Sequence, residues 1–210
     1  MAPRAAARLF VAADIPVEIQ EALAAWGKAA SRTVSHAVES RTPPGLRVIE
    51  PESIHLTLCF LGARPVSDID AIAAVLPTCA AHACELELAS PVWLPRRRPR
   101  ALAVAVREEG GEELQRLQAQ VRDALAAAIA WEPERRRYRP HITVVRVRGG
   151  SRRRRDGHAT LDGALLTAVT LPPTPRLRFM PESVTLYRSQ LEPGGARYEA
   201  LSGCRLLPPE

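Results

Sequence analysis

Lysine is almost absent from this sequence, and long apolar runs are missing. Lys28 is the single lysine among 29 basic residues, so arginine carries nearly all of the positive charge behind the net charge of +6. The first apolar run, from Leu9 to Ala13, is too short for a signal peptide or a membrane helix. We therefore expect a cytoplasmic protein that has no association with membranes.

Cysteine is also scarce, with four residues that show no paired spacing. A framework of disulfides stabilises small secreted domains, whereas 210 residues with 46% apolar content can bury a core unaided. Cys79, His82 and Cys84 lie close together but have no fourth ligand nearby, so their spacing does not favour a zinc site. We predict a reduced protein that needs no disulfide, no metal and no cofactor.

The arginines have two interpretations. A guanidinium group is planar and can hold two phosphate oxygens at once, so an arginine-rich chain suits a polyanionic ligand such as RNA. An Ala- and Arg-rich composition can equally reflect the base composition of the gene. Runs such as Arg96–Arg98 and Arg135–Arg137 either line a path for RNA or form solvated loops. Charge alone does not decide between the two.

Hydrophobic periodicity predicts an α+β protein in which the order strand, helix, strand occurs twice. Apolar runs with strand character end at turn residues, and longer stretches repeat apolar residues at helical spacing. The predicted strands cover residues 8–13, 54–61, 84–88, 101–106, 141–147, 184–189 and 197–201, and the predicted helices begin near residues 16, 68 and 112. We predict one bilobal domain over residues 1–210, with an Arg-, Pro- and Gly-rich loop insertion at residues 149–175.

Two predicted strands carry the same tripeptide pattern, His-x-Thr. Side chains alternate along a strand, so His55 and Thr57 share one face while their aliphatic neighbours point to the other. The same holds for His141 and Thr143. A third copy, at residues 158–160, lies in the predicted loop without an apolar residue before it, and we interpret it as coincidence. Two such strands facing one cleft would bring two imidazoles and two hydroxyls together.

This set of groups is suited to opening a cyclic phosphodiester. One histidine can act as base toward water and the other as acid toward the departing sugar oxygen, and each proton transfer contributes about 100- to 10,000-fold to the rate. Threonine hydroxyls can donate hydrogen bonds to the phosphate oxygens, on which negative charge accumulates. The scheme needs no metal ion, so activity is expected to survive EDTA.

Further residues extend the pattern over nearly the whole chain. They are Arg8-Leu9-Phe10-Val11-Ala12 with Asp14 and Pro16, His55-Leu56-Thr57-Leu58 ending in Phe60-Leu61-Gly62, Arg139-Pro140-His141-Ile142-Thr143 with Arg146, and Gly195-Ala196-Arg197-Tyr198. In this order they resemble the 2H phosphoesterase superfamily, and within it the bacterial RNA 2',3'-cyclic phosphodiesterases, also called the LigT-like or 2'-5' RNA ligase family.

The resemblance implies a bilobal α+β fold in which two antiparallel sheets with outer helices flank a central cleft, with a pseudo-twofold relation between the lobes. It implies hydrolysis of RNA 2',3'-cyclic phosphate ends to 2'-phosphomonoesters, with His55 as proton donor and His141 as proton acceptor. Thr57 and Thr143 would bind the phosphate, and Arg146 is a further candidate. Arg146 lies five residues after His141, so a bulge or bend is needed to bring both side chains to one face.

Two alternatives remain open. The protein could instead act on another cyclic phosphate, derived from a nucleotide or from ADP-ribose, or it could be a non-catalytic module that binds RNA or nucleotides. The intact histidine pair favours catalysis, because binding alone needs no acid and base. We expect a monomer whose partners are RNA with 2',3'-cyclic phosphate ends or cyclic nucleotides, without an obligate protein partner. The same site run in reverse, with a 5'-hydroxyl in place of water, would form a 2'-5' linkage.

Overall fold

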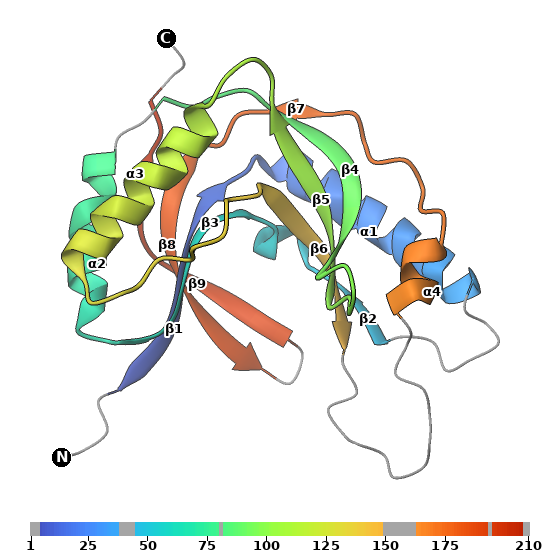
Figure 1. The fold of residues 1–210 in the computed structure, drawn as a ribbon, viewed down its shortest axis with the longest axis horizontal. Coiled ribbons are helices and arrows are strands. Elements are labelled where there is room, and N and C mark those ends of the chain that lie inside the picture. The colour runs from blue at the N-terminus through green and yellow to red at the C-terminus, as the bar shows by residue number, and fades with distance from the viewer. Residues whose placement is uncertain (1–4, 38–44, 80–81, 149–162, 193–194, 208–210) are drawn as a thin grey trace.

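The computed structural model describes residues 5–37, 45–79, 82–148, 163–192 and 195–207. Its strands are β1 (Ala6–Asp14), β2 (Gly45–Val48), β3 (Leu56–Pro65), β4 (Leu86–Leu94), β5 (Ala101–Glu108), β6 (His141–Arg148), β7 (Arg178–Phe179), β8 (Ser183–Glu192) and β9 (Gly195–Arg205). Its α-helices are α1 (Val17–Ala37), α2 (Asp68–Val75), α3 (Glu113–Ala128) and α4 (Gly163–Ala168), and short 3-10 helices cover Pro51–Ser53 and Leu76–Cys79. Figure 1 shows the strands as one curled layer, with α2 and α3 at one side of the molecule and α1 towards the other.

The strands pair antiparallel in the order β7-β4-β5-β6-β3-β1-β8-β9, and β2 also pairs with β6. One half of the sheet contains β3, β1, β8 and β9, and the other contains β7, β4, β5, β6 and β2. Within the described part of the chain, the strands of the two halves pair at one position, Leu56 of β3 opposite Ile142 of β6. The predicted α+β class with antiparallel sheets and outer helices is confirmed, and the two sheets are joined into one.

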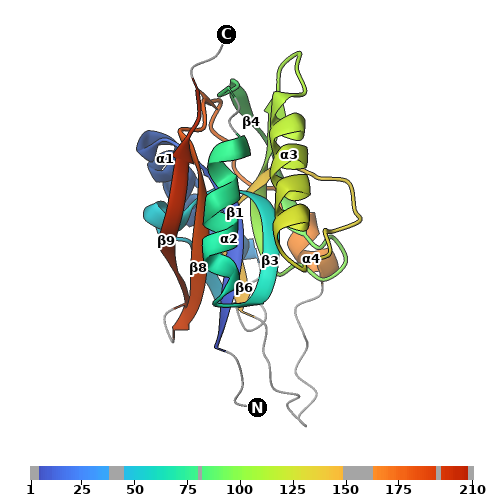
Figure 2. The ribbon, with the colours of Figure 1, turned by 90° about the vertical axis from the view of Figure 1, so that its left-hand side faces the viewer.

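Helices α1 and α3 each pack on the half of the sheet to which the strand before them does not belong. Helix α1 follows β1 in the chain but packs against β2 and β6, whereas α3 precedes β6 but packs against β3 and α2. Figure 2 shows α2 and α3 next to each other, with α1 set apart from them. Each helix buries one stripe of apolar residues at a spacing of three or four, which is why these segments are helical. The stripes are Ile19, Leu23, Trp26, Ala30 and Val34 in α1, and Leu114, Leu117, Val121 and Leu125 in α3.

Part of the predicted loop insertion at residues 149–175 lies within the described residues. Residues 149–162, which include the third His-x-Thr copy, lie outside the described residues. The described part of this stretch is not all loop, since Gly163–Ala168 forms α4, from which Leu166, only 1% exposed, packs into the core. Strand β2 is an addition, since four residues are too few for periodicity to reveal. No helix in the described part of the chain is both long enough and apolar enough to cross a membrane.

Gly27 marks a close approach between α1 and β6. A Cβ atom at this position would lie 3.4 Å from the carbonyl oxygen of Val144 and from Cγ1 of Val48. We expect Gly27→Ala to fit and to stabilise the protein by about 0.5–1 kcal/mol, because alanine favours a helix interior. Gly27→Leu should push α1 away from β6 and cost about 1–3 kcal/mol. Urea unfolding measures both effects, and a leucine variant as stable as the wild type would contradict this packing.

Candidate active site

The pair Leu56–Ile142 brings the two His-x-Thr motifs side by side. These are the middle residues of the motifs, and both are fully buried. In antiparallel strands, the residues that flank such a pair project together to the opposite face. The two histidines and two threonines therefore share one face of the sheet. The Tyr138 hydroxyl, three residues before His141, adds a contact to the first motif, because it donates to the Thr57 carbonyl at 3.0 Å.

A β-bulge in β6 determines where Arg146 points. Thr143 and Val145 oppose neighbouring residues of β5, which leaves Val144 as an extra residue. Val144 and Val145 are consequently both buried, at 0% exposure. Alternation restarts after the bulge, so exposed Arg146 returns to the face that carries His141 and Thr143. The bulge that a phosphate contact by Arg146 requires is therefore present.

Strand β3 has the same irregularity at the same place in its motif. Thr57 and Cys59 oppose neighbouring residues of β1, so Leu58 is the extra residue. Leu58 and Cys59 are both buried, at 4% exposure. In both strands the residue after the motif threonine is thus the bulged one. This local repeat supports the similarity of the two motif strands beyond the tripeptide itself.

Both histidines are held by a backbone carbonyl two residues earlier in the chain. Nδ1 of His55 lies 2.9 Å from the Ser53 oxygen, and Nδ1 of His141 lies 2.7 Å from the Arg139 oxygen. A carbonyl oxygen only accepts, so Nδ1 carries the hydrogen in each ring. Nε2 is then the nitrogen that can take up or release a proton. Because both imidazoles have the same tautomer and each ring is held by its own hydrogen bond, the two are suited to act as an acid and base pair.

Three aromatic rings surround His55. Phe10 of β1 stacks on it with ring centroids 4.8 Å apart, and Tyr198 of β9 meets it edge-on at 5.2 Å. Tyr187 of β8, which is opposite Phe10 in the sheet, lies 6.2 Å away. We did not predict these three residues as part of the site. Phe10 and Tyr198 do belong to the stretches that carry the family resemblance, which was the only signal for them.

Burial in this setting lowers the pKa of His55 from 6.5 to about 4. The Ser53 carbonyl and the Asp14 carboxylate act in the opposite direction, because they stabilise the protonated ring. Electrostatic interactions with Arg146 and His141 lower the pKa of His55 further. This electrostatic coupling agrees with the placement of both residues on the same face as His55.

Asp14 is the acceptor for three hydroxyl groups beside this cluster. Ser183 and Tyr187 donate to its carboxylate at 2.6 and 2.7 Å, and Thr185 also donates to it. Burial, and to a smaller extent the hydrogen bond to Asp14, raises the pKa of Tyr187, so this hydroxyl stays protonated and remains a donor. The carboxylate thereby fixes the Tyr187 ring against Phe10, at a centroid distance of 5.2 Å.

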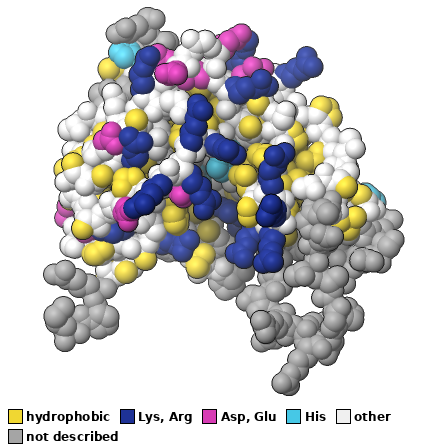
Figure 3. All heavy atoms as spheres, in the orientation of Figure 1, with side chains coloured by type: hydrophobic (Ala, Val, Ile, Leu, Met, Phe, Trp, Pro, Cys, Tyr) yellow, Lys and Arg dark blue, Asp and Glu magenta, His cyan; other side chains and the backbone are white. Residues whose placement is uncertain are grey.

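Arginines surround the face that carries His55, Thr57, His141 and Thr143, which we call the motif face. A histidine is visible in the middle of the face in Figure 3, with Lys and Arg side chains gathered around it. Arg47 of β2 is directly opposite Arg146 of β6, so both project to the same side. A Cβ atom on Gly195 would overlap the Arg47 guanidinium, which shows that Arg47 reaches β9 in the other half of the sheet. Arg47 was not among the predicted site residues.

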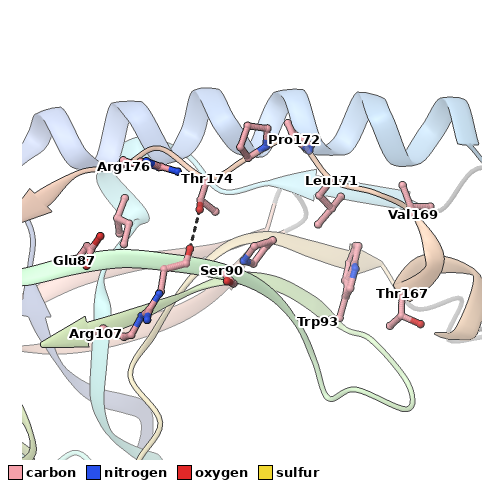
Figure 4. A pocket seen from close by; sticks show the side chains of 14 residues that line it. Glu87, Ser90, Trp93, Arg107, Thr167, Val169, Leu171, Pro172, Thr174 and Arg176 are labelled. Carbon is pink, nitrogen blue, oxygen red and sulfur yellow. Dashed lines mark hydrogen bonds between the residues drawn. The ribbon is translucent and has the colours of Figure 1, made fainter. Parts of the chain in front are cut away.

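A cavity elsewhere in the molecule is a second candidate for a binding site, but it does not include the motifs. A cavity of about 540 Å³ lies between β4 and residues 167–176, with Trp93, Arg107 and Arg176 in its lining (Figure 4). The Thr174 hydroxyl donates to the Ala89 carbonyl at 2.8 Å within it, and no motif residue lines it. Among the residues that the structure describes, no three His, Cys, Asp or Glu side chains are grouped as a metal ion would need.

The curled antiparallel sheet and the paired motifs define a 2H phosphoesterase, and solved structures share this fold. A crystal structure described only as a phosphoesterase matches with a TM-score of 0.70 and 23% identity, covering 97% of this chain and 99% of that one. TT0787 of Thermus thermophilus matches with a TM-score of 0.70 and 24% identity, covering 97% and 100%. LigT of E. coli in complex with phosphate gives 0.67 and 24%, covering 96% and 98%.

The chain belongs to the 2'-5' RNA ligase superfamily. The model of this family matches residues 22–192, which is most of the chain. A search of curated proteins gives no significant match. The resemblance drawn from the sequence is therefore confirmed. The individual roles of His55, His141, Thr57, Thr143 and Arg146 stay predictions.

The burial of His55 predicts a pH-dependent loss of stability. Between pH 6.5 and about 4 the unfolded chain binds a proton on this ring that the folded protein does not. The stability is thus complete above this range and falls as the pH drops through it, by an amount on the order of 3 kcal/mol at most. The variant His55→Gln cannot titrate and should lose this part of the dependence. Urea unfolding between neutral pH and pH 4 tests this prediction. If the free energy of unfolding fell in parallel with pH in the wild type and in His55→Gln, the prediction would be contradicted.

Proposed function

We propose that this protein hydrolyses the 2',3'-cyclic phosphate ends of RNA to 2'-phosphomonoesters. The observation that carries the proposal is the shared face of the two His-x-Thr motifs, in which both histidines are bonded through Nδ1 and leave Nε2 for proton transfer. Displacement at phosphorus needs such an acid and base around one phosphate. LigT of E. coli has been crystallised with phosphate and with 3'-AMP, which carry groups that an RNA end also presents.

The two histidines divide the proton transfers in the proposed reaction. Nε2 of His141 takes a proton from water while the water oxygen forms a bond to phosphorus. The bond between phosphorus and O3' breaks, and His55 gives its Nε2 proton to O3'. The phosphate stays on O2' as a monoester. One proton has moved to His141 and one has left His55, so exchange with solvent restores the pair.

The remaining predicted residues would stabilise the charge on the phosphate. The hydroxyls of Thr57 and Thr143 lie on the motif face and can donate to the two non-bridging oxygens. Arg146 is brought to this face by the bulge in β6 and can neutralise the negative charge that grows in the transition state. Donors that are already in place cost little reorganisation during the reaction.

The acid role of His55 requires a proton that the free protein holds weakly, since its pKa is about 4. A bound phosphate brings a negative charge next to the ring, and such a charge favours the protonated form. Asp14 acts in the same direction from the other side. We propose that the bound substrate raises the pKa of His55, so that the ring takes up from solvent the proton that it then gives to O3'.

Imidazole NMR signals can test this coupling. His55 should titrate near pH 4 in the free protein and at least about one pH unit higher with 2'-AMP bound, because the phosphate charge stabilises the imidazolium. Chemical-shift changes of other residues confirm that 2'-AMP is bound. An unchanged titration of His55 in the complex would contradict its role as acid and favour the opposite assignment of the two histidines.

Product chromatography tests the reaction directly. The protein is incubated in EDTA with a short RNA, and separately with a mononucleotide, each ending in a 2',3'-cyclic phosphate. We expect conversion to the 2'-phosphate, and a loss of at least about 100-fold in His55→Ala and in His141→Ala. Both variants should still bind 2'-AMP. His36→Ala, an exposed position on α1, serves as the matched control.

Each other outcome favours a different function. Turnover of cyclic mononucleotides or of an ADP-ribose-derived cyclic phosphate, but not of RNA, would favour the alternative substrates. Binding without turnover of any cyclic phosphate would favour a non-catalytic module. Activity that EDTA abolishes and a divalent metal restores would overturn the two-histidine scheme.

A further inference from the structure

Three consecutive arginines, Arg96, Arg97 and Arg98, lie in the connection between β4 and β5, and we call them the arginine turn. All three are exposed. No ion pair involves them among the residues that the structure describes. The segment from Ser90 to Arg107 contains no Asp or Glu, so acidic neighbours in sequence do not offset their charge either. The turn therefore presents positive charge to solvent that no described carboxylate offsets through an ion pair.

The arginine turn lies at one end of the strands that carry the motif face. His141 is opposite Ala105 of β5, and Arg146 is opposite Ala101, the residue at the turn end of β5. Four residues of extended strand span about 13 Å, so Arg146 stands between His141 and the turn. Figure 3 shows Lys and Arg side chains reaching from the central histidine towards the end of the face where Figure 1 places this turn.

The backbone around the turn is fixed on both sides. The Arg100 amide donates to the Leu94 carbonyl at 2.8 Å, and the Val147 amide of β6 donates to the Arg100 carbonyl at 2.9 Å. Pro99, between the run and Arg100, is buried. The arginines therefore project from an anchored hairpin, and a ligand that binds them has less backbone to order.

The second arginine run, Arg135–Arg137, differs from the arginine turn because two of its side chains form ion pairs. Arg135 pairs with Glu132 at 2.7 Å, and Arg136 pairs with Glu134 at 3.4 Å. These pairs are exposed and weak, but they offset much of the local charge. Of the two runs that the sequence leaves as candidates for an RNA path, the structure favours the arginine turn.

We propose that the arginine turn binds the phosphodiester backbone of the RNA chain that leads to the cyclic phosphate. The terminal phosphate occupies the motif face, and the chain on its 5' side runs along β6 past Arg146 to the turn. Arginines bind such a backbone through its charge and without regard to sequence. The protein then prefers polynucleotide ends to cyclic mononucleotides. This inference rests on the proposed function and names the substrate class of the same site.

Two charge-matched triple variants test the inference. The first replaces Arg96, Arg97 and Arg98 by alanine, and the control replaces Arg32, Arg116 and Arg178, which are exposed on α1, α3 and β7. Fluorescence anisotropy measures binding of a labelled single-stranded RNA of about ten nucleotides that ends in a 2'-phosphate. Turnover is compared between an RNA and a mononucleotide, each with a 2',3'-cyclic phosphate, at several salt concentrations.

We expect the arginine-turn variant to bind the RNA at least about ten-fold more weakly than the control, with a salt dependence of log Kd lower by about 2, since each lost phosphate contact removes ~0.7. Its kcat/KM should fall for the RNA and stay unchanged for the mononucleotide. Equal RNA binding and turnover in the two variants would overturn the inference and leave the proposed function standing. A wild type that turns over neither substrate would overturn the proposed function, and the anisotropy comparison would still decide whether the turn binds RNA.

Discussion

The pairing of Leu56 with Ile142 is the contact on which the candidate site depends. Among the described residues it is the single strand pairing between the two halves of the sheet, and it lies at the centre of both motifs. A shift of register by one residue would turn the motif histidines into the core and expose aliphatic side chains, which costs far more than one hydrogen bond. The burial of this pair therefore sets the register, and the register places four polar side chains on one face.

The sequence predicted the parts of the site that follow from alternation along one strand. His55, Thr57 and the aliphatic residues between them are of this kind. The bulges were also visible in principle, because Leu58-Cys59 and Val144-Val145 are adjacent apolar pairs that break the alternation. The strand order could not be predicted in this way, since it depends on contacts between segments far apart in the chain. For the same reason periodicity did not reveal the rings of Phe10, Tyr187 and Tyr198 around His55.

The environment of His55 combines two opposite effects on one ring. Aromatic neighbours remove water and disfavour the charged form, while Asp14 favours it. A partly desolvated ring is also more sensitive to any new charge, because electrostatic interactions are stronger in a medium of low dielectric constant. The cluster thus gives a histidine that is neutral in the free protein and responsive to an anionic ligand. Asp14 keeps this cluster in place through its three hydroxyl donors.

The packing of α1 and α3 across the two halves of the sheet limits how the halves can move relative to each other. Because α1 leaves β1 to pack on β2 and β6, and α3 packs on β3, neither half has a complete apolar core without the other. The halves are interlocked, and a hinge that swung them apart would have to strip a helix from its sheet. Because the motif histidines lie at the starts of β3 and β6, one strand from each half, we expect their spacing to be the same before and after a ligand binds.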